Sequence, residues 1–217
     1  MTELLGDYDK CFSDATDSIS GIIDGHVTEK GETLNLEWNY NNGQYFNVNT
    51  QITGAYNLEN VLAAVAVGCF YNVSNNDICE AISLYKPTNS RSQIVITDRN
   101  RIIMDAYNAN PSSMNASLDN FNSLDYANKV VILGAMRELG IEQHNQHNSI
   151  IEKLDKMNLD KVFLVGKEWA EFKTQYPKFT YVEDALMIKE DVEALSKKNI
   201  LIKGSRSNKL ERTLEWL

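Results

Sequence analysis

Apolar and polar positions alternate in the first part of the chain as they do in half-buried strands. Residues 33–38 (TLNLEW) follow a period of two, which is typical of a strand with one buried face. The Asn-Asn-Gly run at 41–43 is a turn signal, and residues 44–48 (QYFNV) have the pattern of the returning strand. The pattern predicts a β-hairpin within a first segment of loops and short strands, residues 1 to about 55.

The pattern then changes to two helical stretches and a linker. Residues 58–71 are apolar on a broad face and predict a buried helix. A second helix is expected at 75–85, where a serine or asparagine at its start is suited to capping. The proline-containing segment 86–90 ends this helix and has the composition of a linker. We therefore place a domain boundary between a first domain, 1–89, and a second, 90–217.

Short apolar runs alternate with helical patterns in the second domain. Strands are expected at Gln93–Thr97, Arg101–Asp105, Val130–Leu133, Val162–Val165 and Ile200–Lys203. Helices are expected at Ser113–Asn122, His144–Met157, Trp169–Gln175, Ala185–Ser196 and Lys209–Trp216. Apolar strands separated by helices predict an α/β fold, a mostly parallel sheet with helices on both faces. Ligands of such folds lie at the carboxyl ends of the strands.

Composition narrows the class of protein. The 217 residues carry a net charge of −9, which disfavours nucleic acid as a partner because phosphate contacts need clustered Lys and Arg. The three cysteines, at 11, 69 and 79, are odd in number and form no CxxC pair. They indicate reduced thiols in a cytoplasmic protein rather than disulfides or a zinc site. No apolar run is long enough for membrane insertion, and we expect a monomer.

The first segment with candidate chemistry is GAYNLENVLAA at 54–64. Asn57 and Asn60 are three residues apart at the start of the predicted helix, so both lie on one face. An amide offers a donor and an acceptor, as the edge of an adenine requires. The alternative is that Asn57 caps the helix and Asn60 is an exposed polar residue, and the spacing alone favours this alternative.

The second segment is DAYNANPSSM, which follows a buried strand, together with Arg91. Asp105 ends the strand and could accept hydrogen bonds from ribose hydroxyls, while Asn108 and Asn110 could orient phosphate or substrate groups. Ser112 or Ser113 could cap the next helix, whose amino end favours anions. A polar turn that only links strand to helix explains the run equally well.

Two further segments follow predicted strands. LGAMRELG at 133–140 is a glycine-flanked loop that leads into a helix carrying His147. His147 either contacts substrate or holds the loop, and a single histidine on a helix is more often structural. KGSR at 203–206 places basic residues around Gly-Ser, where they either meet an anion or form a solvated turn.

Several catalytic motifs do not occur in the sequence. It contains no GxxxxGK[ST] phosphate loop, and Gly166-Lys167-Glu168 lacks both the leading glycine spacing and the hydroxyl residue. No HExxH or GxSxG motif is present either. No metal ligands are therefore assigned within this chain.

GAYNLENVLAA, DAYNANPSSM, LGAMRELG with its following histidine, and KGSR occur in this order over roughly residues 50–206. Together they resemble the Mur ligases of peptidoglycan synthesis. DAYNANP points to the branch of that family that joins D-alanyl-D-alanine to UDP-MurNAc-tripeptide. The resemblance implies a Rossmann-like carboxyl-terminal domain, preceded by part of an α/β ATP-binding central domain.

The resemblance also implies a chemistry. ATP phosphorylates the tripeptide carboxylate, and the amine of D-alanyl-D-alanine then attacks the acyl phosphate. The central domain supplies the phosphate loop and the Mg²⁺ ligands, which we expect outside this chain. Domain closure would exclude water from the acyl phosphate.

Residue by residue, the resemblance assigns three kinds of role. Nucleotide contacts fall to Asn57, Asn60, Arg91, Asp105 and Tyr107. Catalytic positions next to the acyl phosphate fall to Asn108 and Asn110. Substrate contacts fall to Ser112, Ser113, Arg137, His147, Lys203, Ser205 and Arg206.

The sequence departs from the family in two respects. Tyr56 stands where many relatives have histidine, and the UDP-binding domain and phosphate loop are absent from the 217 residues. We therefore expect a piece of a longer protein that does not catalyse ligation alone. A stand-alone nucleotide-binding module and a folylpolyglutamate synthetase-like ligase are the two alternatives, and DAYNANP disfavours the second.

Overall fold

A computed structural model describes residues 23–41 and 43–217 of the chain. The chain divides into two compact units, one ending at Lys86 and the other spanning Pro87–Leu217, whereas the sequence predicts the division after residue 89. Each unit is described by itself. Cys11 and the central residue of the predicted turn, Asn42, lie outside the described residues.

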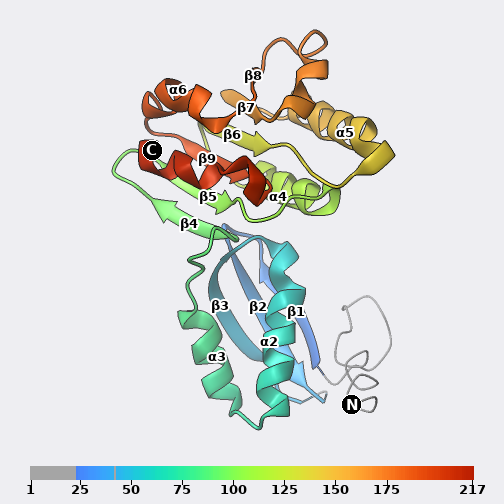
Figure 1. The fold of residues 1–217 in the computed structure, drawn as a ribbon. Helices are drawn as coiled ribbons and strands as arrows, with labels where there is room; N and C mark the ends of the chain where they lie inside the picture. The colour runs from blue at the N-terminus through green and yellow to red at the C-terminus, as the bar shows by residue number, and fades with distance from the viewer. Residues whose placement is uncertain (1–22, 42) are drawn as a thin grey trace. The chain divides into compact units, whose positions relative to one another are not determined.

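The first unit contains a three-stranded antiparallel sheet of order β1-β2-β3 (Figure 1). Its strands are β1 (Ile23–Glu29), β2 (Thr33–Tyr40) and β3 (Phe46–Thr53). The pairing of β2 with β3 confirms the predicted hairpin. Strand β1 is not anticipated in the sequence, because Gly25 and several polar residues obscure its alternation.

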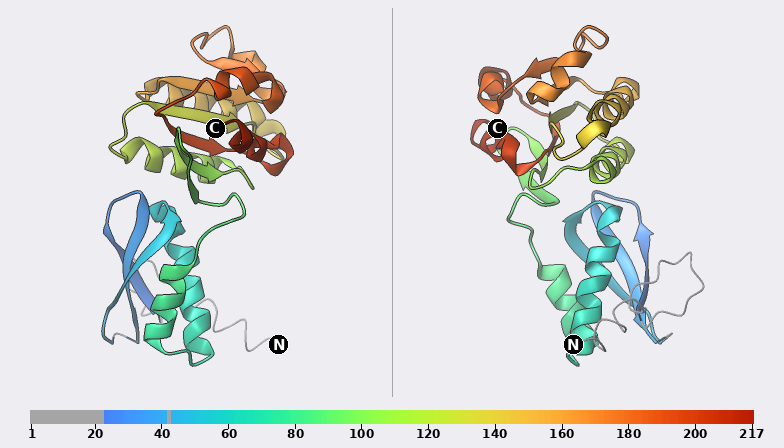
Figure 2. Two further views of the ribbon diagram at one scale, coloured as in Figure 1. Left: turned by 90° about the vertical axis from the view of Figure 1, so that its left-hand side faces the viewer. Right: turned by 45° about the vertical axis from the view of Figure 1, so that its right-hand side comes forward.

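Two helices cover one face of this sheet (Figure 2). After a 3-10 turn, η1 (Ala55–Asn57), come α2 (Leu58–Phe70) and α3 (Asn75–Leu84), close to their predicted positions. Val61, Leu62 and Val65 of α2 are buried against apolar residues of the strands, including Trp38. Ser74 caps α3, since its side chain accepts a hydrogen bond from the Asp77 amide.

The second unit contains a six-stranded sheet of order β4-β5-β9-β6-β7-β8. Its strands are β4 (Gln93–Ile96), β5 (Arg101–Asp105), β6 (Lys129–Gly134), β7 (Lys161–Val165), β8 (Thr180–Val182) and β9 (Asn199–Lys203). All pairs are parallel except β4 with β5. The mostly parallel α/β fold is therefore confirmed. The three-residue edge strand β8 is too short to give a period in the sequence.

Alternate residues of the central strands enter two separate cores, because successive side chains of a strand point to opposite faces. Ile103, Val131 and Leu201 pack in one core with helices α4 (Pro111–Ser123) and α5 (Gln143–Lys156). Their sequence neighbours pack in the other with α6 (Lys189–Glu193) and the carboxyl-terminal segment. Figure 2 shows helical segments on both faces of this sheet, as predicted.

Three of the predicted helices are wholly or partly 3-10 segments. They are η3 (Lys167–Phe172), η4 (Ala185–Ile188), which leads into α6, and η6 (Leu210–Trp216), while the turns η2 (Gly140–Glu142) and η5 (Arg206–Asn208) are not predicted. In η3 the buried residues Trp169 and Phe172 are three apart, the period of a 3-10 helix. No helix of the described residues is long and apolar enough to cross a membrane.

Candidate functional site

The candidate residues of the second unit collect at one edge of its sheet. Asp105 is the last residue of β5 and Lys203 the last of β9, and the two are directly paired in the register. Gly134, which ends β6, begins the loop that carries Arg137. Because Gln93 of antiparallel β4 pairs with Met104, the segment with Arg91 lies at this same edge. Three sequence motifs far apart in the chain therefore converge where parallel α/β sheets bind ligands.

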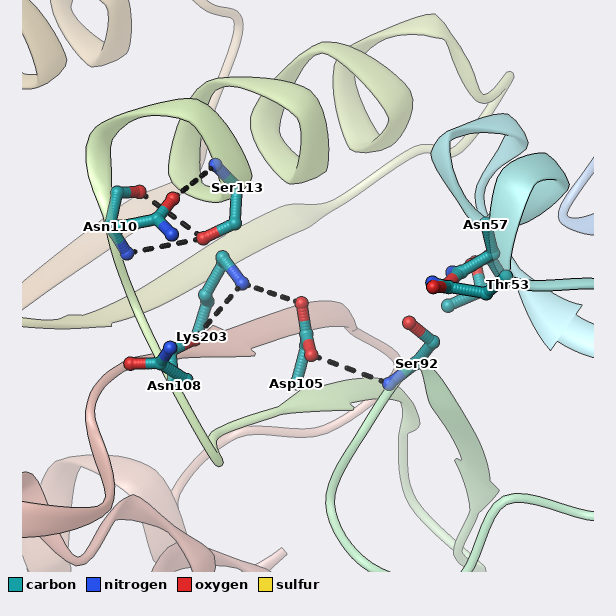
Figure 3. Close-up of polar contacts among 9 residues, drawn as sticks. Thr53, Asn57, Ser92, Asp105, Asn108, Asn110, Ser113 and Lys203 are labelled. Atoms are coloured by element: carbon teal, nitrogen blue, oxygen red, sulfur yellow. Dashed lines mark hydrogen bonds and ion pairs between the residues drawn. The ribbon is translucent and has the colours of Figure 1, made fainter. Parts of the chain in front are cut away.

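A buried ion pair joins β5 to β9 at this edge. The Lys203 ammonium lies 2.6 Å from one Asp105 carboxylate oxygen, and the Lys203 side chain is 2% exposed. The second carboxylate oxygen lies 3.4 Å from the Ser92 amide nitrogen, which donates to it (Figure 3). Lys203 also donates to the Asn108 carbonyl. The ion pair therefore supports the segments that contain Ser92 and Asn108. Both carboxylate oxygens of Asp105 are already hydrogen-bonded before any ligand binds.

Two guanidinium groups flank the Tyr107 ring. The Arg91 guanidinium carbon is 3.7 Å from the ring centroid, and that of Arg206 is 5.6 Å from it. The Arg206 backbone amide donates to the Tyr107 carbonyl. Both arginines are exposed, and neither forms a salt bridge within the described part of the chain. The cluster of Arg91, Tyr107 and Arg206 is consequently a positive, aromatic surface suited to an anionic ligand.

The loop after Tyr107 ends in a helix cap that the sequence interpretation assigned to the wrong residue. The Asn110 side chain accepts a hydrogen bond from the Ser113 amide, and the Ser113 hydroxyl accepts one from the Asn110 amide. This capping box starts α4 at Pro111, so the cap is neither Ser112 nor Ser113 (Figure 3). Asn110 and Ser113 are engaged in the cap. Asn108, Asn110 and Ser112 are exposed. Catalytic roles for Asn108 and Asn110 stay predictions.

His147 holds the loop that follows β6. The residue has no exposed surface, and its Nε2 accepts a hydrogen bond from the Met136 amide. Its Nδ1 lies 2.8 Å from the Gln143 carbonyl and donates to it, so the ring is the neutral Nδ1–H tautomer. Burial lowers the pKa of His147, which favours this neutral form. Of the two roles considered for His147, this geometry matches the support of the loop.

The same loop presents Arg137, which contacts a residue that the sequence interpretation missed. The Arg137 guanidinium pairs with Glu168 in η3, just beyond the end of β7. The Arg137 side chain is 43% exposed and that of Glu168 only 5%. In the sequence, Gly166-Lys167-Glu168 resembles only an incomplete phosphate loop. Its position directly after a buried strand is the signal that identifies Glu168 as a member of the edge.

Ser205 and Asn208 complete the end of β9. The Ser205 hydroxyl accepts a hydrogen bond from Ser207. Asn208 lies over Gly134, since a side chain added to this glycine would place its Cβ 2.5 Å from the Asn208 Oδ1. The carboxyl ends of β6 and β9 therefore approach each other closely, and a larger residue at position 134 would displace Asn208.

In the first unit, the paired asparagines form a local network. The Asn57 side-chain amide donates to the Thr53 carbonyl, and its oxygen accepts from the Asn60 amide. Asn57 occupies the cap position of α2 but makes no capping hydrogen bond with its side chain. Gly54 has a positive φ of 91°, and the Tyr56 ring fills the space beside it. The adenine-binding role of Asn57 and Asn60 stays a prediction, with Asn60 exposed.

Metal binding has no support in the described residues. Within residues 23–41 and 43–217, no group of three or more His, Cys, Asp or Glu side chains is arranged to hold a metal ion. No magnesium site is assigned in this part of the chain.

Comparison with known proteins identifies relatives for most of the chain. Residues 90–206 match the family model described as "Mur ligase, glutamate ligase domain". The chain is 33% identical over 178 residues to the UDP-N-acetylmuramoyl-tripeptide–D-alanyl-D-alanine ligase of Bacillus subtilis, a match that covers 76% of this chain. It covers 38% of that relative, so the chain spans well under half the length of the relative.

Solved structures show the same fold. A MurF crystal structure from Acinetobacter baumannii superposes with a TM-score of 0.80 at 21% identity, over 94% of this chain and 46% of that one. The MurF ligase of Thermotoga maritima in complex with ADP gives 0.73 at 22% identity, over 90% and 46%. At these identities the superpositions establish the fold alone.

Proposed function

Because the chain belongs to the Mur ligase family through its glutamate ligase domain, we propose that it is the carboxyl-terminal part of an ATP-dependent ligase. The ligase adds D-alanyl-D-alanine to UDP-MurNAc-tripeptide in peptidoglycan synthesis, in the cytoplasm, where ATP and UDP-linked precursors are available. The name of the Bacillus subtilis relative supports this choice of substrates. The observation that carries the proposal is the convergence of DAYNANP, LGAMRELG and KGSR at one sheet edge.

In this proposal, the nucleotide contacts are those that the family resemblance assigns. Asn57 and Asn60 contact adenine. Asp105 accepts from a ribose hydroxyl, because carboxylate oxygens retain acceptor capacity beyond the bonds to Lys203 and Ser92. Arg91 faces the phosphates, and its stacking on Tyr107 orients its donors.

The reaction needs a phosphorylated carboxylate and a free amine in one water-poor site. Once ATP has phosphorylated the tripeptide carboxylate, the dipeptide amine attacks the acyl carbon and inorganic phosphate leaves. Asn108, whose side chain is exposed, orients the phosphoryl oxygens, and Asn110 supports it from the cap. Ser112 and Ser113, at the amino end of α4, lie where the helix dipole favours a substrate anion.

The dipeptide is bound through the end of β6 and the KGSR segment. The half-exposed Arg137 provides donors for the dipeptide carboxylate, and Arg206 and Ser205 approach from β9. Lys203 and His147 contribute indirectly, by supporting the residues that contact the substrate, since both are buried and already hydrogen-bonded. Mg²⁺ would neutralise charge on the nucleotide phosphates, and no ligand for it is assigned in the described residues.

Stereospecific ligand binding tests the proposal on the chain as it is. Titration of the 217-residue protein with D-alanyl-D-alanine, in the presence of ATP and Mg²⁺, is expected to give saturable binding by calorimetry. L-alanyl-L-alanine is the matched control and is expected to bind at least about tenfold more weakly, because its methyl groups point elsewhere in a fixed site. Equal binding of both dipeptides, or of neither, would contradict the proposed substrate.

A folate titration and an ATP titration separate the alternatives. A folylpolyglutamate synthetase-like ligase would bind a reduced folate, whereas the proposed ligase would not. A stand-alone nucleotide module would bind ATP tightly and show no response to the D,D-dipeptide.

A further inference from the structure

A single imidazole joins the two ends of the loop between β6 and α5. The His147 Nε2 accepts a hydrogen bond from the Met136 amide at 3.1 Å, and its Nδ1 donates to the Gln143 carbonyl at 2.8 Å. Residues 137–142 therefore form a loop whose base is closed by one side chain. Arg137 is the first residue of this loop, and its position at the sheet edge depends on that closure.

The loop itself is mostly exposed. Apart from the half-buried Leu139, its residues are exposed, and Ile141 is 96% exposed. Glu138 and Gly140 have positive φ angles of 61° and 54°, a conformation that a residue other than glycine adopts only at a cost. An exposed loop that contains such strain gains little from its own contacts, so its conformation depends on the bonds at its base.

The residues just before the loop are firmly held. The Ala135 amide donates to the Val165 carbonyl, and Met136 has no exposed surface. Gly166 lies so close to this segment that a Cβ added to it would be 2.7 Å from the Ala135 Cβ. Movement that follows a loss of the closure is therefore confined to residues 137–142.

The closure requires a neutral ring. The Met136 amide can only donate, and a protonated imidazole has no nitrogen left to accept. Protonation would leave two N–H donors facing each other, and His147 and Met136 have no exposed surface through which water could separate them. Unpaired buried donors are costly, so a proton on His147 and the closed loop exclude each other.

The charges that act on the ring come from three elements. Burial is the largest influence and lowers the pKa of His147. Glu168 and Glu171 of η3 favour the protonated ring, whereas Arg137 of the loop opposes it. On α5 itself, His144 is exposed and pairs with Glu171. The ring is therefore neutral near pH 7, and two carboxylates are available to stabilise an imidazolium once the loop has opened.

We infer that His147 is a proton-operated clasp on residues 137–142, and that ligand binding at the end of β6 requires the closed clasp. The closed clasp holds the Arg137 guanidinium beside Glu168, where the proposed function has it meet the dipeptide carboxylate. The inference rests on the proposed function for its ligand, and it makes His147 a positioning residue for Arg137. Dipeptide affinity is full above about pH 7 and falls as the ring becomes protonated.

Two variants fix the clasp in opposite states. His147→Gln can accept from the Met136 amide with its side-chain oxygen but cannot titrate, whereas His147→Leu has no acceptor at any pH. D-alanyl-D-alanine is titrated by calorimetry into the wild-type chain and both variants, with ATP and Mg²⁺, at pH 7.5 and at pH 5.5. The wild-type affinity is expected to fall by about threefold or more, because one coupled proton changes an affinity by up to about tenfold per pH unit.

The variants should bracket the wild type. His147→Gln is expected to bind at both pH values within about threefold of the wild type at pH 7.5, and His147→Leu to bind weakly at both. Protonation of the ligands themselves is common to all titrations, so only differences between the proteins count. His144→Gln is the matched control, since it removes an exposed histidine one turn earlier on α5 and should keep the wild-type pH dependence.

The Met136 amide reports on the clasp without a ligand. Its NMR resonance is expected to shift, and its protection from hydrogen exchange to decrease, as the wild-type His147 ring is protonated between pH 7.5 and 5.5. In His147→Gln neither change should occur. Should the variants fail to fold, the wild-type Met136 amide and the His147 ring resonances decide the matter.

The outcomes separate the clasp from the proposed function. If wild-type affinity changes with pH no more than that of His147→Gln, or if the Met136 amide does not respond over this range, the clasp is wrong while the ligase assignment stands. If D-alanyl-D-alanine does not bind even at pH 7.5, the proposed substrate fails, and the response of the Met136 amide alone then supports or overturns the clasp.

Discussion

Two ion pairs at one sheet edge differ in how completely they are satisfied. Asp105 and Lys203, at the ends of β5 and β9, are both buried, and each carboxylate oxygen has a donor. Arg137 and Glu168, beyond β6 and β7, consist of a half-exposed base and a buried acid whose Oε2 has no hydrogen-bond partner among the described residues. The first pair has the properties of a support for the edge, and the second has spare capacity that a ligand can use.

Hydrogen-bond satisfaction distinguishes the structural charged residues of a site from those that bind a ligand. A buried pair with all of its hydrogen bonds made inside the protein gains little from a ligand, whereas removing one partner leaves an uncompensated charge. A pair with an exposed donor and an orphan acceptor is costly without a ligand. Complete satisfaction therefore indicates a scaffold, and incomplete satisfaction indicates a binding group.

Removal of Lys203 is the most severe test of the first pair. Lys203→Met leaves the Asp105 carboxylate buried without its counter-ion, and we expect the free energy of unfolding to fall by about 3–5 kcal/mol. Chemical denaturation measures this loss. Asp105→Leu combined with Lys203→Met removes both charges and should recover most of it.

Lys198→Met provides the control for that experiment. Lys198 forms a partly exposed pair with Asp160, with side chains 26% and 41% exposed. Its loss should change the free energy of unfolding by no more than about 1 kcal/mol. A Lys203→Met variant that is as stable as Lys198→Met would remove the argument for a scaffold.

The second prediction concerns the crowded glycine beneath Glu168. Gly166→Ala combines a positive φ with contacts too close to Ala135 and Glu168, so we expect a loss of about 2–3 kcal/mol. Gly140→Ala is a matched control, since Gly140 has a φ of +54° and nothing within 4 Å of an added Cβ. Its loss should be about 1 kcal/mol.

The difference between the two glycine variants isolates the crowding at the Glu168 oxygen. If Gly166→Ala and Gly140→Ala are equally destabilised in thermal and chemical unfolding, the close approach of η3 to the loop after β6 does not constrain Glu168.

The sequence identified the edge of the sheet because strand ends can be read from it. DAYNANP and KGSR each follow an apolar run, and in an α/β fold such runs place their final residues together. The order of the strands cannot be read in this way, because local patterns do not say that β9 inserts between β5 and β6. The direct pairing of Asp105 with Lys203 was therefore not predictable.

The hydrogen-bond partners of individual side chains could not be predicted from the sequence either. The pattern suggested a serine cap for α4, but Asn110 competes better for the cap when proline follows it as the first helical residue. Glu168 belongs to no recognisable motif. Its candidate role depends on its burial and on the lack of a hydrogen-bond donor to its Oε2 among the described residues. Both are properties of packing, which the order of residues along one segment does not contain.

The third prediction uses pH to test the support that the β6 loop receives from His147. Burial lowers the pKa of His147 in the folded chain below its ordinary value of 6.5, so the unfolded chain binds more protons below that pH. Stability is therefore expected to be unaffected by His147 above about pH 7 and to fall as the pH decreases through 6.5. The slope from one proton is at most about 1.4 kcal/mol per pH unit.

Charged neighbours modify this dependence, since Glu168 and Glu171 favour the protonated ring and Arg137 opposes it. The His147→Gln variant, which cannot titrate, should lose this part of the pH dependence in denaturation curves between pH 7.5 and 5. The exposed His144 is the control, and His144→Gln should retain the slope. An unchanged slope in His147→Gln would show that the loop does not depend on a neutral ring.

The smallest effect on stability is expected at the cluster of Arg91, Tyr107 and Arg206. Stacking of an exposed guanidinium on a ring contributes about 0.5–1 kcal/mol, so Arg91→Ala and Arg206→Ala should each unfold within about 1 kcal/mol of the wild type.

We expect Arg91→Ala and Arg206→Ala to weaken anion binding more than they lower the free energy of unfolding. Exposed binding residues contribute little to stability but contact the ligand directly. Arg91→Ala is expected to weaken ATP binding by about tenfold through the loss of a charge-assisted contact to phosphate, as calorimetry would measure. Arg212→Ala, which removes an exposed arginine from η6, is the control for net charge and should leave ATP binding nearly unchanged. The prediction is contradicted if Arg91→Ala destabilises the chain as much as Lys203→Met, or weakens ATP binding no more than Arg212→Ala. The cluster then belongs with the scaffold, and the contrast between satisfied and unsatisfied charges does not extend to it.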